Sequence, residues 1–428
     1  MAKSYMNKKS IKDLPTSDIT GKRILVRVDF NVPMKDGVIQ DDTRIKAALP
    51  TLNYILDQKP KTLVLMSHLG DPKKDMQKAK EKAEQAGKPF DEEKYLNAKH
   101  RMAPIAAHLS KLLNRPVQLA PAAIGAATKA MVDKLQSGDV LMLENTRFHK
   151  EETSKVESER ESMAKELASY ADLFVNDAFG TAHRAHASTE TVAHYLPAVA
   201  GLLMEKEMIY LGKVLENPDR PFIAIIGGAK VSSKIAVLEN LLQKVDRLIV
   251  GGGMAYTFLK AKGLSVGTSL VEDDMLDKAR EILQIAYEKQ IYIYLPIDHI
   301  VTQEFSADAE FRHVARGNIE DGWMGMDIGP LTIQKFEGAL KGAKTVFWNG
   351  PLGVFEFENF SKGTMAIAKA IADLPDCTTI IGGGDSVSAV NKSGVADKMT
   401  HISTGGGASL ELIEGKVLPG IAALQDKA

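Results

Sequence analysis

The sequence predicts an α/β protein made of two doubly wound parallel-sheet domains, Rossmann-like in arrangement, that are joined by a hinge helix. A chain of 428 residues is too long for one ordinary hydrophobic core. Short runs of apolar, β-branched residues alternate along it with longer helical patterns, and strands that are apolar throughout are typical of parallel sheets covered on both faces. These runs fall into two sets on either side of residues 194–222, which we interpret as a long helix.

The expected strands define the two domains. The first set is "RILVRVDF", "TLVLMSH", "DVLMLEN" and "LFVNDAF", and the second is "FIAIIGG", "RLIVGGG", "IYIYLP", "TVFWNG", "TTIIGGG" and "HISTGGG". We therefore expect one domain over residues 1–197 and the other over residues 198–409, with the hinge in a helix near residues 198–216. Residues 72–100 form a Lys/Glu-rich excursion in which both signs of charge are interleaved, so we expect a solvated helix and loop there.

The composition excludes several classes of function. A formal net charge of −1 provides no general attraction for nucleic acid or for an anionic membrane. No apolar run is long enough to span a bilayer, and the first residues lack the apolar stretch of a signal peptide. The single cysteine, Cys377, allows neither an intrachain disulfide nor a thiolate metal cluster. We expect a cytoplasmic monomer that acts on small molecules.

Four glycine-rich turns between strands and helices dominate the second half. They are "IIGGAKVSSK", "IVGGGMAYTF", "IIGGGDSVSA" and "STGGGASLEL". Open parallel sheets bind ligands at the carboxyl ends of their strands, where helix N-termini offer free N–H groups to phosphates. One such turn is usually only a tight connection, but four favour a polyphosphate site. The turns lack both G-x-G-x-x-G and G-x-x-x-x-G-K-[ST], which argues against a Rossmann dehydrogenase and a P-loop enzyme.

Four polar residues at these turns predict how the phosphates are held. Lys230 and Lys234 are four residues apart at the start of an expected helix, so we expect them on one face, contacting phosphates. The alternative is a pair of solvated surface lysines. Asp385 would repel an anion unless a cation lay between them, which predicts a Mg²⁺ ion bound by this carboxylate. Asp385 could equally be a helix N-cap, a role compatible with metal binding, and Ser386 would supply a hydroxyl or a cap.

Basic residues dominate the ends of the apolar runs in the first half. These turns carry Arg27, Asp29, Asn31, Arg44, His68, Arg147, His183, Arg184 and His186. A lone arginine in such a place is more often part of a structural ion pair. Convergence from five turns instead favours an anion with phosphate and carboxylate ends. No third ligand accompanies His183 and His186, so we do not expect a metal there.

With these residues assembled, the sequence resembles the phosphoglycerate kinase family from "RVDFNVP" to "STGGGASLELIEGKVLPG". The most specific shared stretches are "ENTRFHKEE", "VNDAFGTAHRAH", "GGGMAYTFL", "WNGPLGVFE" and "IIGGGDS". The resemblance implies reversible, Mg²⁺-dependent transfer of a phosphoryl group from 1,3-bisphosphoglycerate to ADP, giving 3-phosphoglycerate and ATP in glycolysis. It also implies an N-terminal domain for the acid, a C-terminal domain for the nucleotide, and a tail of about residues 410–428 packed onto the N-terminal domain.

The resemblance also implies roles for individual residues. On the acid side these are Asp29, Asn31, Arg44, His68, Arg147 and Arg184. On the nucleotide side they are Lys230, Lys234, Gly252, Gly325, Asn349, Glu356, Gly383, Gly384, Asp385 and Ser386, with Mg²⁺ on Asp385. The catalytic group would comprise Arg44, Lys234, Gly405 and Gly406, with Gly407 helping to aim a helix N-terminus at the phosphoryl group in transfer.

The sequence departs from the family pattern at a few positions. Asp71 in "SHLGDP" stands where an arginine usually contributes to the acid's phosphate site. We predict that Arg101, at the end of the excursion, replaces that cation in substrate binding. Ser233 stands where an Asp is common, which loosens the expected orientation of Lys234, and Ser386 keeps a hydroxyl where Thr also occurs.

The expected chemistry explains why no general base stands out. A carboxylate acceptor is already ionised at neutral pH, since such acids have pKa values near ~4. Phosphoryl transfer passes through a loose state, so the protein mainly positions the reactants and neutralises charge. Two domains that each hold one substrate must close on each other, which predicts a hinge motion. A catalytically inactive binding protein would keep the fold without Arg44, Lys234 and Asp385, all of which are present.

Overall fold

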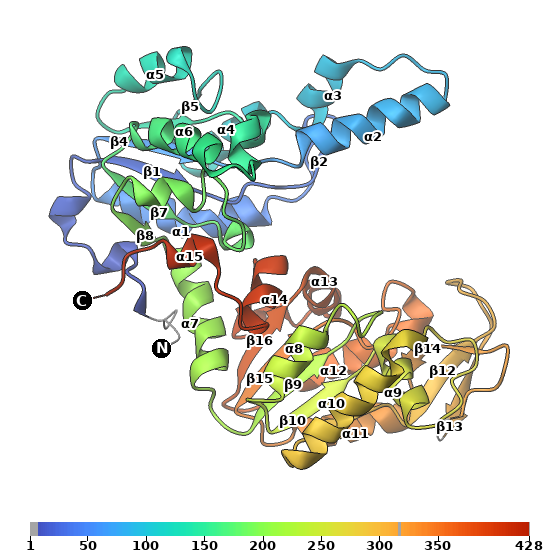
Figure 1. Ribbon diagram of the computed structural model, residues 1–428. Helices are drawn as coiled ribbons and strands as arrows, with labels where there is room; N and C mark the ends of the chain where they lie inside the picture. The colour runs from blue at the N-terminus through green and yellow to red at the C-terminus, as the bar shows by residue number, and fades with distance from the viewer. Residues whose placement is uncertain (1–6, 316–317, 428) are drawn as a thin grey trace. The chain divides into compact units, whose positions relative to one another are not determined.

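The structure is a computed structural model that describes residues 7–315 and 318–427. The chain divides into two compact units. Unit 1 comprises Met1–Ile209 with Val417–Ala428, and unit 2 comprises Tyr210–Lys416. The division between Ile209 and Tyr210 falls within helix α7 (Leu202–Glu216), which is visible in Figure 1.

Unit 1 contains a six-stranded parallel sheet in the order β5-β6-β4-β1-β7-β8. Its strands are β1 (Arg23–Arg27), β4 (Thr62–Met66), β5 (Val117–Leu119), β6 (Asp139–Met142), β7 (Leu173–Asn176) and β8 (Ala198–Ala200). The four strands expected from apolar runs are present. Both faces of β1 are buried, as its apolar sequence predicts: Ile24 and Val26 enter one core cluster, and Leu25 is buried on the other side.

The segment before the hinge corrects one expectation. Residues 198–200 form strand β8 beside β7, not the first turn of a helix. Helix α7 begins only at Leu202, after Gly201. The helix prediction was wrong for these residues because three small apolar residues carry no period that separates strand from helix.

The remaining elements of unit 1 cover the sheet and add the excursion. They are α1 (Thr43–Asp57), α2 (Pro72–Gln85), α3 (Glu92–Lys99), α4 (Ala103–Leu112), α5 (Ala126–Asp133), α6 (Glu157–Ala168), α15 (Pro419–Ala422), and the hairpin of β2 (Met34–Lys35) and β3 (Val38–Ile39). The Lys/Glu-rich excursion forms α2 and α3, which extend away from the sheet of unit 1 in Figure 1. Asp71 caps α2 by accepting a hydrogen bond from the Lys74 amide at 3.2 Å.

Unit 2 contains a second six-stranded parallel sheet, in the order β11-β10-β9-β15-β16-β17. Its strands are β9 (Phe222–Ile226), β10 (Arg247–Val250), β11 (Tyr292–Tyr294), β15 (Thr345–Asn349), β16 (Thr378–Gly382) and β17 (His401–Ile402). The strand order reverses between β9 and β15, so the carboxyl ends of these two strands open a crevice suited to a ligand. All six strands of this sheet coincide with runs expected from the sequence.

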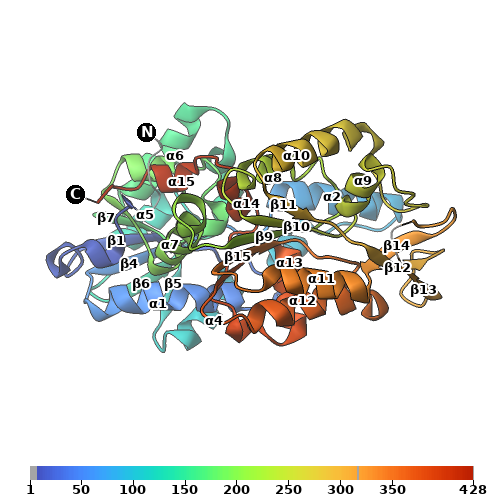
Figure 2. The same cartoon turned by 90° about the horizontal axis from the view of Figure 1, so that it is seen from below.

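Helices lie on both faces of this sheet. Figure 2 shows α8, α9 and α10 on one side and α11, α12 and α13 on the other. The helices are α8 (Ile235–Leu241), α9 (Met254–Ala261), α10 (Leu276–Glu288), α11 (Pro330–Leu340), α12 (Lys362–Ala372), α13 (Gly384–Ser393) and α14 (Gly407–Ile413). Two doubly wound sheets confirm the predicted fold class. Among the described residues, no helix combines the length and apolar character that crossing a membrane would require.

Unit 2 also has an antiparallel sheet that the sequence analysis missed. It is ordered β13-β12-β14, from β12 (Asp298–Thr302), β13 (Phe311–Ala315) and β14 (Met324–Ile328). A β-bulge interrupts the pairing of β12 with β14 between Ile300 and Val301. The edge of this sheet forms part of the candidate site described below.

Candidate functional site

The basic residues of unit 1 follow neighbouring strands. Asp29 and Asn31 come after β1, His68 after β4 and Arg147 after β6, while Arg184 and His186 follow β7. Because β6, β4, β1 and β7 are adjacent and parallel, their carboxyl ends meet along one edge. The sheet topology therefore brings these residues together.

Direct contacts link most of the predicted acid-binding residues. Arg44 Nη1 lies 2.9 Å from Asp29 Oδ2. The Gly70 amide donates to Asn31 Oδ1 at 2.7 Å, and Arg147 Nη1 donates to the Gly70 carbonyl oxygen at 2.8 Å. Gly70 thus joins the turns after β1 and β6 to the turn after β4.

Beneath these residues lies Arg27, which is fully buried. Its Nε donates to Ser188 Oγ at 2.8 Å, and its Nη2 lies 3.1 Å from His68 Nδ1. We call Arg27, Arg44, His68, Arg147 and His186 the basic cluster. Burial places Arg27 in a structural role, holding the His68 ring in position.

The basic cluster raises the local electrostatic potential enough to affect its own histidines. Burial, followed by the charges of Arg147, Arg27 and Arg184, lowers the pKa of His186 to about 3. Burial and the charges of Arg27 and Arg147 likewise hold the pKa of His68 well below its ordinary value. Both rings are therefore neutral at pH 7, and the excess positive charge of the guanidinium groups favours a bound anion.

Arg101 occupies different surroundings. Its guanidinium lies 3.5 Å from Glu144 Oε2 and 4.9 Å from the centre of the Phe148 ring, with 38% of the side chain exposed. Phe148 follows Arg147 directly, so Arg101 packs against the turn that carries a predicted substrate ligand. The role of Arg101 in binding the acid stays a prediction.

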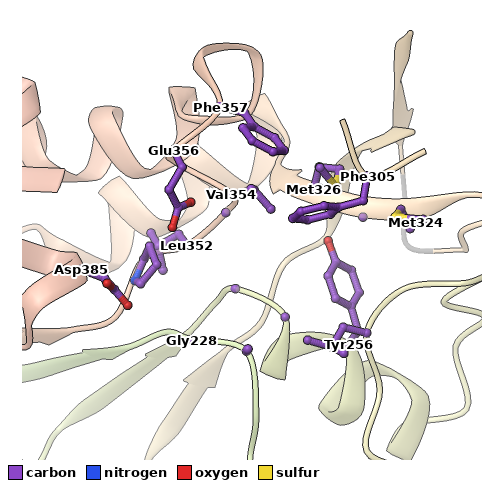
Figure 3. A pocket seen from close by; sticks show the side chains of 17 residues that line it. Gly228, Tyr256, Phe305, Met324, Met326, Leu352, Val354, Glu356, Phe357 and Asp385 are labelled. Atoms are coloured by element: carbon purple, nitrogen blue, oxygen red, sulfur yellow. The ribbon is translucent and has the colours of Figure 1, made fainter. Parts of the chain in front are cut away.

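Unit 2 has a cavity of about 520 Å³ whose walls are mainly apolar. We call it the apolar cavity. Figure 3 shows Asp385 and Glu356 toward one end and the rings of Tyr256 and Phe305 toward the other. Gly252, Gly325, Glu356 and Asp385, all predicted to bind nucleotide, line it.

The other wall residues of the apolar cavity were not predicted. They include Tyr256, Leu270, Phe305, Met324, Met326 and Phe357. These side chains come from α9, from β14 and from three separate loops, so no single motif contains them. Of these six, only Tyr256 belongs to a stretch that carries the family resemblance, "GGGMAYTFL".

A second cavity, of about 350 Å³, contains the remaining predicted nucleotide residues. We call it the lysine cavity. It is lined by Lys230, Lys234, Asn349, Gly383, Gly384, Asp385 and Ser386, among others. The two cavities share Gly228, Ala229, Pro351 and Asp385, so an apolar compartment leads directly into a basic, glycine-lined one.

Two glycines, Gly383 in the lysine cavity and Gly252 in the apolar cavity, are required by their surroundings. Gly383 has φ +86°, and a Cβ atom there would lie 2.7 Å from Asn349 Nδ2. Gly252 has φ +68°, and its Cβ would lie 2.8 Å from the Gly228 backbone. Side chains at either position would be strained and would occlude the main-chain groups that face the cavity.

Two expectations about the polar residues here were wrong in detail. Lys234 is the N-cap of α8 and Lys230 precedes that helix, so their spacing of four places them in a turn, not on one helix face. Both nevertheless line the lysine cavity. Lys234 is half-buried, whereas Lys230 is exposed, so the alternative of a solvated lysine still describes Lys230. Gly383 is the N-cap of α13, and Asp385 lies in its first turn, so neither Asp385 nor Ser386 is a cap. The Ser386 hydroxyl instead accepts a hydrogen bond from the Gly350 amide.

Lys234 and Asn349 form a polar pair at the end of β15. Lys234 Nζ donates to Asn349 Oδ1, and burial lowers the pKa of Lys234 while the charges of Asp385 and Glu414 oppose that change. Asn349 Nδ2 is buried without a hydrogen-bond partner. A buried donor of this kind is costly unless a ligand completes it, so its orientation suits a phosphate oxygen in the lysine cavity.

The last glycine cluster, residues 405–407, does not line the cavities as the other glycine-rich turns do. Gly407 begins α14 and Gly406 has φ +47°, whereas the Gly405 amide already donates to Ser403 Oγ at 3.1 Å. Neither Gly405 nor Gly406 lines either cavity, although Leu410 of α14 lines the lysine cavity. Their predicted contact with the transferring group stays a prediction.

Comparisons with known proteins give one answer. The family model described as phosphoglycerate kinase matches residues 11–416. The phosphoglycerate kinase of Treponema pallidum (strain Nichols) is 53% identical over 413 residues, covering 95% of this chain and 98% of the relative. That of Rippkaea orientalis is 54% identical, covering 98% of this chain and 100% of the relative. The solved phosphoglycerate kinase from Coxiella burnetii superposes with a TM-score of 0.83 at 41% identity, covering 97% of this chain and 98% of that one.

A more distant structure agrees. The crystal structure of the Pyrococcus horikoshii phosphoglycerate kinase gives a TM-score of 0.78 at 34% identity, with 97% of this chain and 98% of that chain covered. Matches of this length span both units and both groups of site residues. The chain is a phosphotransferase that belongs to the phosphoglycerate kinase family.

Proposed function

We propose that the nucleotide of the phosphoglycerate kinase reaction occupies the two connected cavities of unit 2 and that 3-phosphoglycerate occupies the basic cluster of unit 1. The chain carries out the family's glycolytic reaction, reversible phosphoryl transfer between 1,3-bisphosphoglycerate and ADP. One observation supports the nucleotide assignment above all: an apolar cavity and a lysine- and glycine-lined cavity share a wall that carries Asp385. Base and ribose fit the first compartment, and the phosphates fit the second.

The residues present fit a Mg²⁺ ion that arrives with the nucleotide. The described residues contain no group of three or more His, Cys, Asp or Glu side chains that could hold a metal by themselves. Mg²⁺ needs no such group when phosphate oxygens supply the other ligands, since one carboxylate then suffices. We propose that Asp385 is this carboxylate, and Mg²⁺ would neutralise phosphate charge there.

On the nucleotide side, this chain's residues position and neutralise. We propose that Lys234, held by Asn349 Oδ1, places its ammonium beside the transferring phosphoryl group, while Asn349 Nδ2 donates to a phosphate oxygen. Lys230 and the amides after Gly383 bind the remaining phosphate oxygens. Glu356 binds the ribose, and Gly252 and Gly325 leave room for the adenosine.

On the acid side, the guanidinium groups hold the substrate. Arg147 and Arg184 bind its phosphate end together with His68, whose neutral ring donates or accepts a hydrogen bond without adding charge. Asp29 orients Arg44 across a 2.9 Å ion pair. We propose that Arg44 stabilises the phosphoryl group in transfer, and that no base is needed because the acceptor carboxylate is already ionised.

Because the two substrates bind in different units, transfer requires both units to bring their ligands together. We propose that α7, which contains the division between the units, is the hinge. Solution scattering of the free protein and of the protein with 3-phosphoglycerate and a Mg-nucleotide tests this, and we expect a smaller radius of gyration with both ligands. An unchanged radius would contradict a hinge motion.

The tail and the domain limits belong to the same proposal. The segment from Val417 onward belongs to unit 1, where Lys8 Nζ donates to the Leu424 carbonyl at 2.7 Å and the Gln425 amide donates to the Ala198 carbonyl at 2.9 Å. We propose that units 1 and 2 are the two functional domains, so that β8 belongs to the first and α14 to the second, in place of the limits 1–197, 198–409 and 410–428 expected from the sequence. We also propose that the enzyme works as a cytoplasmic monomer, which light scattering and cell fractionation would test.

A coupled assay with 3-phosphoglycerate and Mg-ATP tests the assignment of Arg44. We expect Arg44→Ala to lower kcat by about 10³-fold or more, since one guanidinium at a transferring phosphoryl group contributes ~10³–10⁵ in related chemistry. Affinity for the nucleotide should change little because Arg44 lies in unit 1. Near-normal turnover would refute its role.

A further inference from the structure

One wall of the apolar cavity rests on a buried carboxylate that the reaction itself does not use. Met326 in β14 lines the cavity, and the next residue, Asp327, is 1% exposed. Successive side chains of a strand point to opposite faces. Met326 faces the apolar cavity, so Asp327 points away from it, behind the wall. The amide of Val354, another wall residue, donates to the Met326 carbonyl at 2.8 Å, and both side chains are visible in Figure 3.

Asp327 uses both carboxylate oxygens. Oδ1 accepts from its own neighbour, the Ile328 amide, at 2.9 Å, and Oδ2 accepts from the Gly363 amide, in the first turn of α12, at 2.8 Å. A helix N-terminus favours a negative charge. The carboxylate therefore links β14 to the first turn of α12 behind the cavity wall.

Two glycines show how tightly this carboxylate is enclosed. A Cβ atom on Gly353 would lie 2.2 Å from Asp327 Oδ1, and one on Gly363 would lie 2.5 Å from the same oxygen. Gly353 itself lines the apolar cavity, in the loop that continues to Glu356 and Phe357. The path of the loop that forms this wall is thus set by contact with the Asp327 carboxylate.

We propose that Asp327 is a positioning residue for the nucleotide: its ionised carboxylate holds the wall formed by Met326, Gly353, Val354 and Glu356 in the shape that binds the base and ribose. The inference rests on the proposed placement of the nucleotide in the apolar cavity. Asp327 would contact no substrate and would act only through the cavity wall that it supports.

The charge state of Asp327 then affects nucleotide binding near neutral pH. Burial raises the pKa of this carboxyl to about 7, against the hydrogen bonds from Gly363 and Ile328 and the charge of Lys362. The titratable groups that face it are Lys362 of α12 and Tyr256 of α9, whose pKa is raised by burial and by Asp327. Protonation would put an O–H opposite one of two backbone N–H donors, so one hydrogen bond is lost as the pH falls through about 7.

Asp327→Asn tests this proposal because the amide has one oxygen for two N–H donors. We expect the Kd for Mg-ADP, measured by calorimetry at about pH 8, to rise roughly tenfold, with the KM for 3-phosphoglycerate unchanged. Asp177→Asn is the matched control, since Asp177 is an equally buried acid with a pKa raised to about 7 in unit 1. It should leave the Kd for Mg-ADP as in the parent protein.

The pH profile separates positioning from general damage. Excess Mg²⁺ keeps the ADP phosphates ionised, so the Kd of the parent protein should rise between about pH 8 and about pH 6 while that of Asp327→Asn stays flat. This measurement on the parent protein also serves if the variant does not fold. An equal Kd for the parent and Asp327→Asn at pH 8, or parallel pH profiles, would overturn the role of Asp327.

A third variant distinguishes failure of the nucleotide-site assignment from failure of the Asp327 inference. Glu356→Ala removes a group that faces the apolar cavity directly. If it weakens Mg-ADP binding while Asp327→Asn does not, the nucleotide site stands and the Asp327 inference fails. If Glu356→Ala leaves the Kd unchanged, the nucleotide lies elsewhere and both proposals fail.

Discussion

Replacing Asp177 with Asn should change how the stability of unit 1 depends on pH. Asp177 follows β7 and is fully buried, and its Oδ1 accepts from the amides of Leu203 and Met204 at 2.9 Å and 3.2 Å, in the first turn of α7. Its Oδ2 is buried without a hydrogen-bond partner. Burial raises the pKa of this carboxyl to about 7, and the nearby Thr51 side chain and the amides of Met204 and Leu203 only partly oppose it.

The magnitude follows from this pKa. The native pKa of about 7 lies above the ordinary value of 3.8, so the native state holds its proton more tightly than the unfolded state does. The folded protein therefore gains stability from this group below pH 4 and loses it as the pH rises from 4 to 7. At about 1.4 kcal/mol per pKa unit, the loss is roughly 4 kcal/mol and is complete above pH 7.

The assay is urea unfolding of the parent protein and Asp177→Asn between about pH 5 and pH 8, followed by circular dichroism. Trp323 and Trp348 both lie in unit 2, so tryptophan fluorescence would miss the unfolding of unit 1. The variant lacks the ionisation but buries an amide N–H₂ where Oδ2 has no partner, at a cost of about 1–3 kcal/mol that does not vary with pH. We expect the free energy of unfolding of the parent, minus that of the variant, to fall by about 1.4 kcal/mol per pH unit between pH 5 and pH 7. A difference that stays constant over this range would refute the reasoning.

Two further substitutions test individual site residues. Arg101→Ala should raise the KM for 3-phosphoglycerate severalfold with kcat retained, because Arg101 stacks on Phe148 beside Arg147. The control is Arg115→Ala, which removes another arginine of unit 1. An unchanged KM for Arg101→Ala would refute the idea that Arg101 replaces the cation missing at Asp71. Gly383→Ala should weaken Mg-ADP binding about tenfold or more, since its Cβ would meet Asn349 Nδ2 at 2.7 Å in a backbone of φ +86°. Gly384→Ala, whose Cβ would meet nothing within 4 Å, should weaken it less, and equal effects of the two would contradict this account.

The sequence predicted the two parallel sheets because their strands are buried on both faces and therefore read as unbroken apolar runs. Strands that lack this signal were missed: β8 is three small residues, and β13 has alternating burial on an exposed edge. The basic residues expected to converge in the first half follow neighbouring strands of one sheet, so the topology alone brings them to one edge. His68 and Arg147, for example, follow the adjacent strands β4 and β6.

The rest of the site depends on contacts that no local pattern encodes. Tyr256, Phe305 and Met326 meet only because β14 and the loop that carries Phe305 fold against α9. The spacing of Lys230 and Lys234 suggested a helix face, but a turn delays the start of α8 to Ile235. Asp327 lies two residues after the predicted Gly325 and belongs to no motif, and its proposed role depends on its burial and on its hydrogen bonds with the Ile328 and Gly363 amides.

Asp177 and Asp327 occupy similar structural positions in the two units. Each is a buried acid whose pKa is raised to about 7, and each accepts hydrogen bonds from amides in the first turn of a helix, α7 or α12. Each also requires a nearby glycine. A Cβ atom on Gly201 would lie 2.1 Å from Asp177 Oδ1, and a Cβ atom on Gly353 would lie 2.2 Å from Asp327 Oδ1.

A protein that keeps two such carboxylates gives up stability at neutral pH to fix the path of a turn, which a salt bridge to a flexible side chain would fix less well. Because the two acids lie in different units, their effects should be independent. The double variant Asp177→Asn/Asp327→Asn should therefore lose the pH dependence of both groups, and its change in slope between about pH 5 and pH 7 should equal the sum of the two single changes. A double variant whose slope matched either single variant would show that one acid alone controls the titration and that the parallel between the units is only geometric.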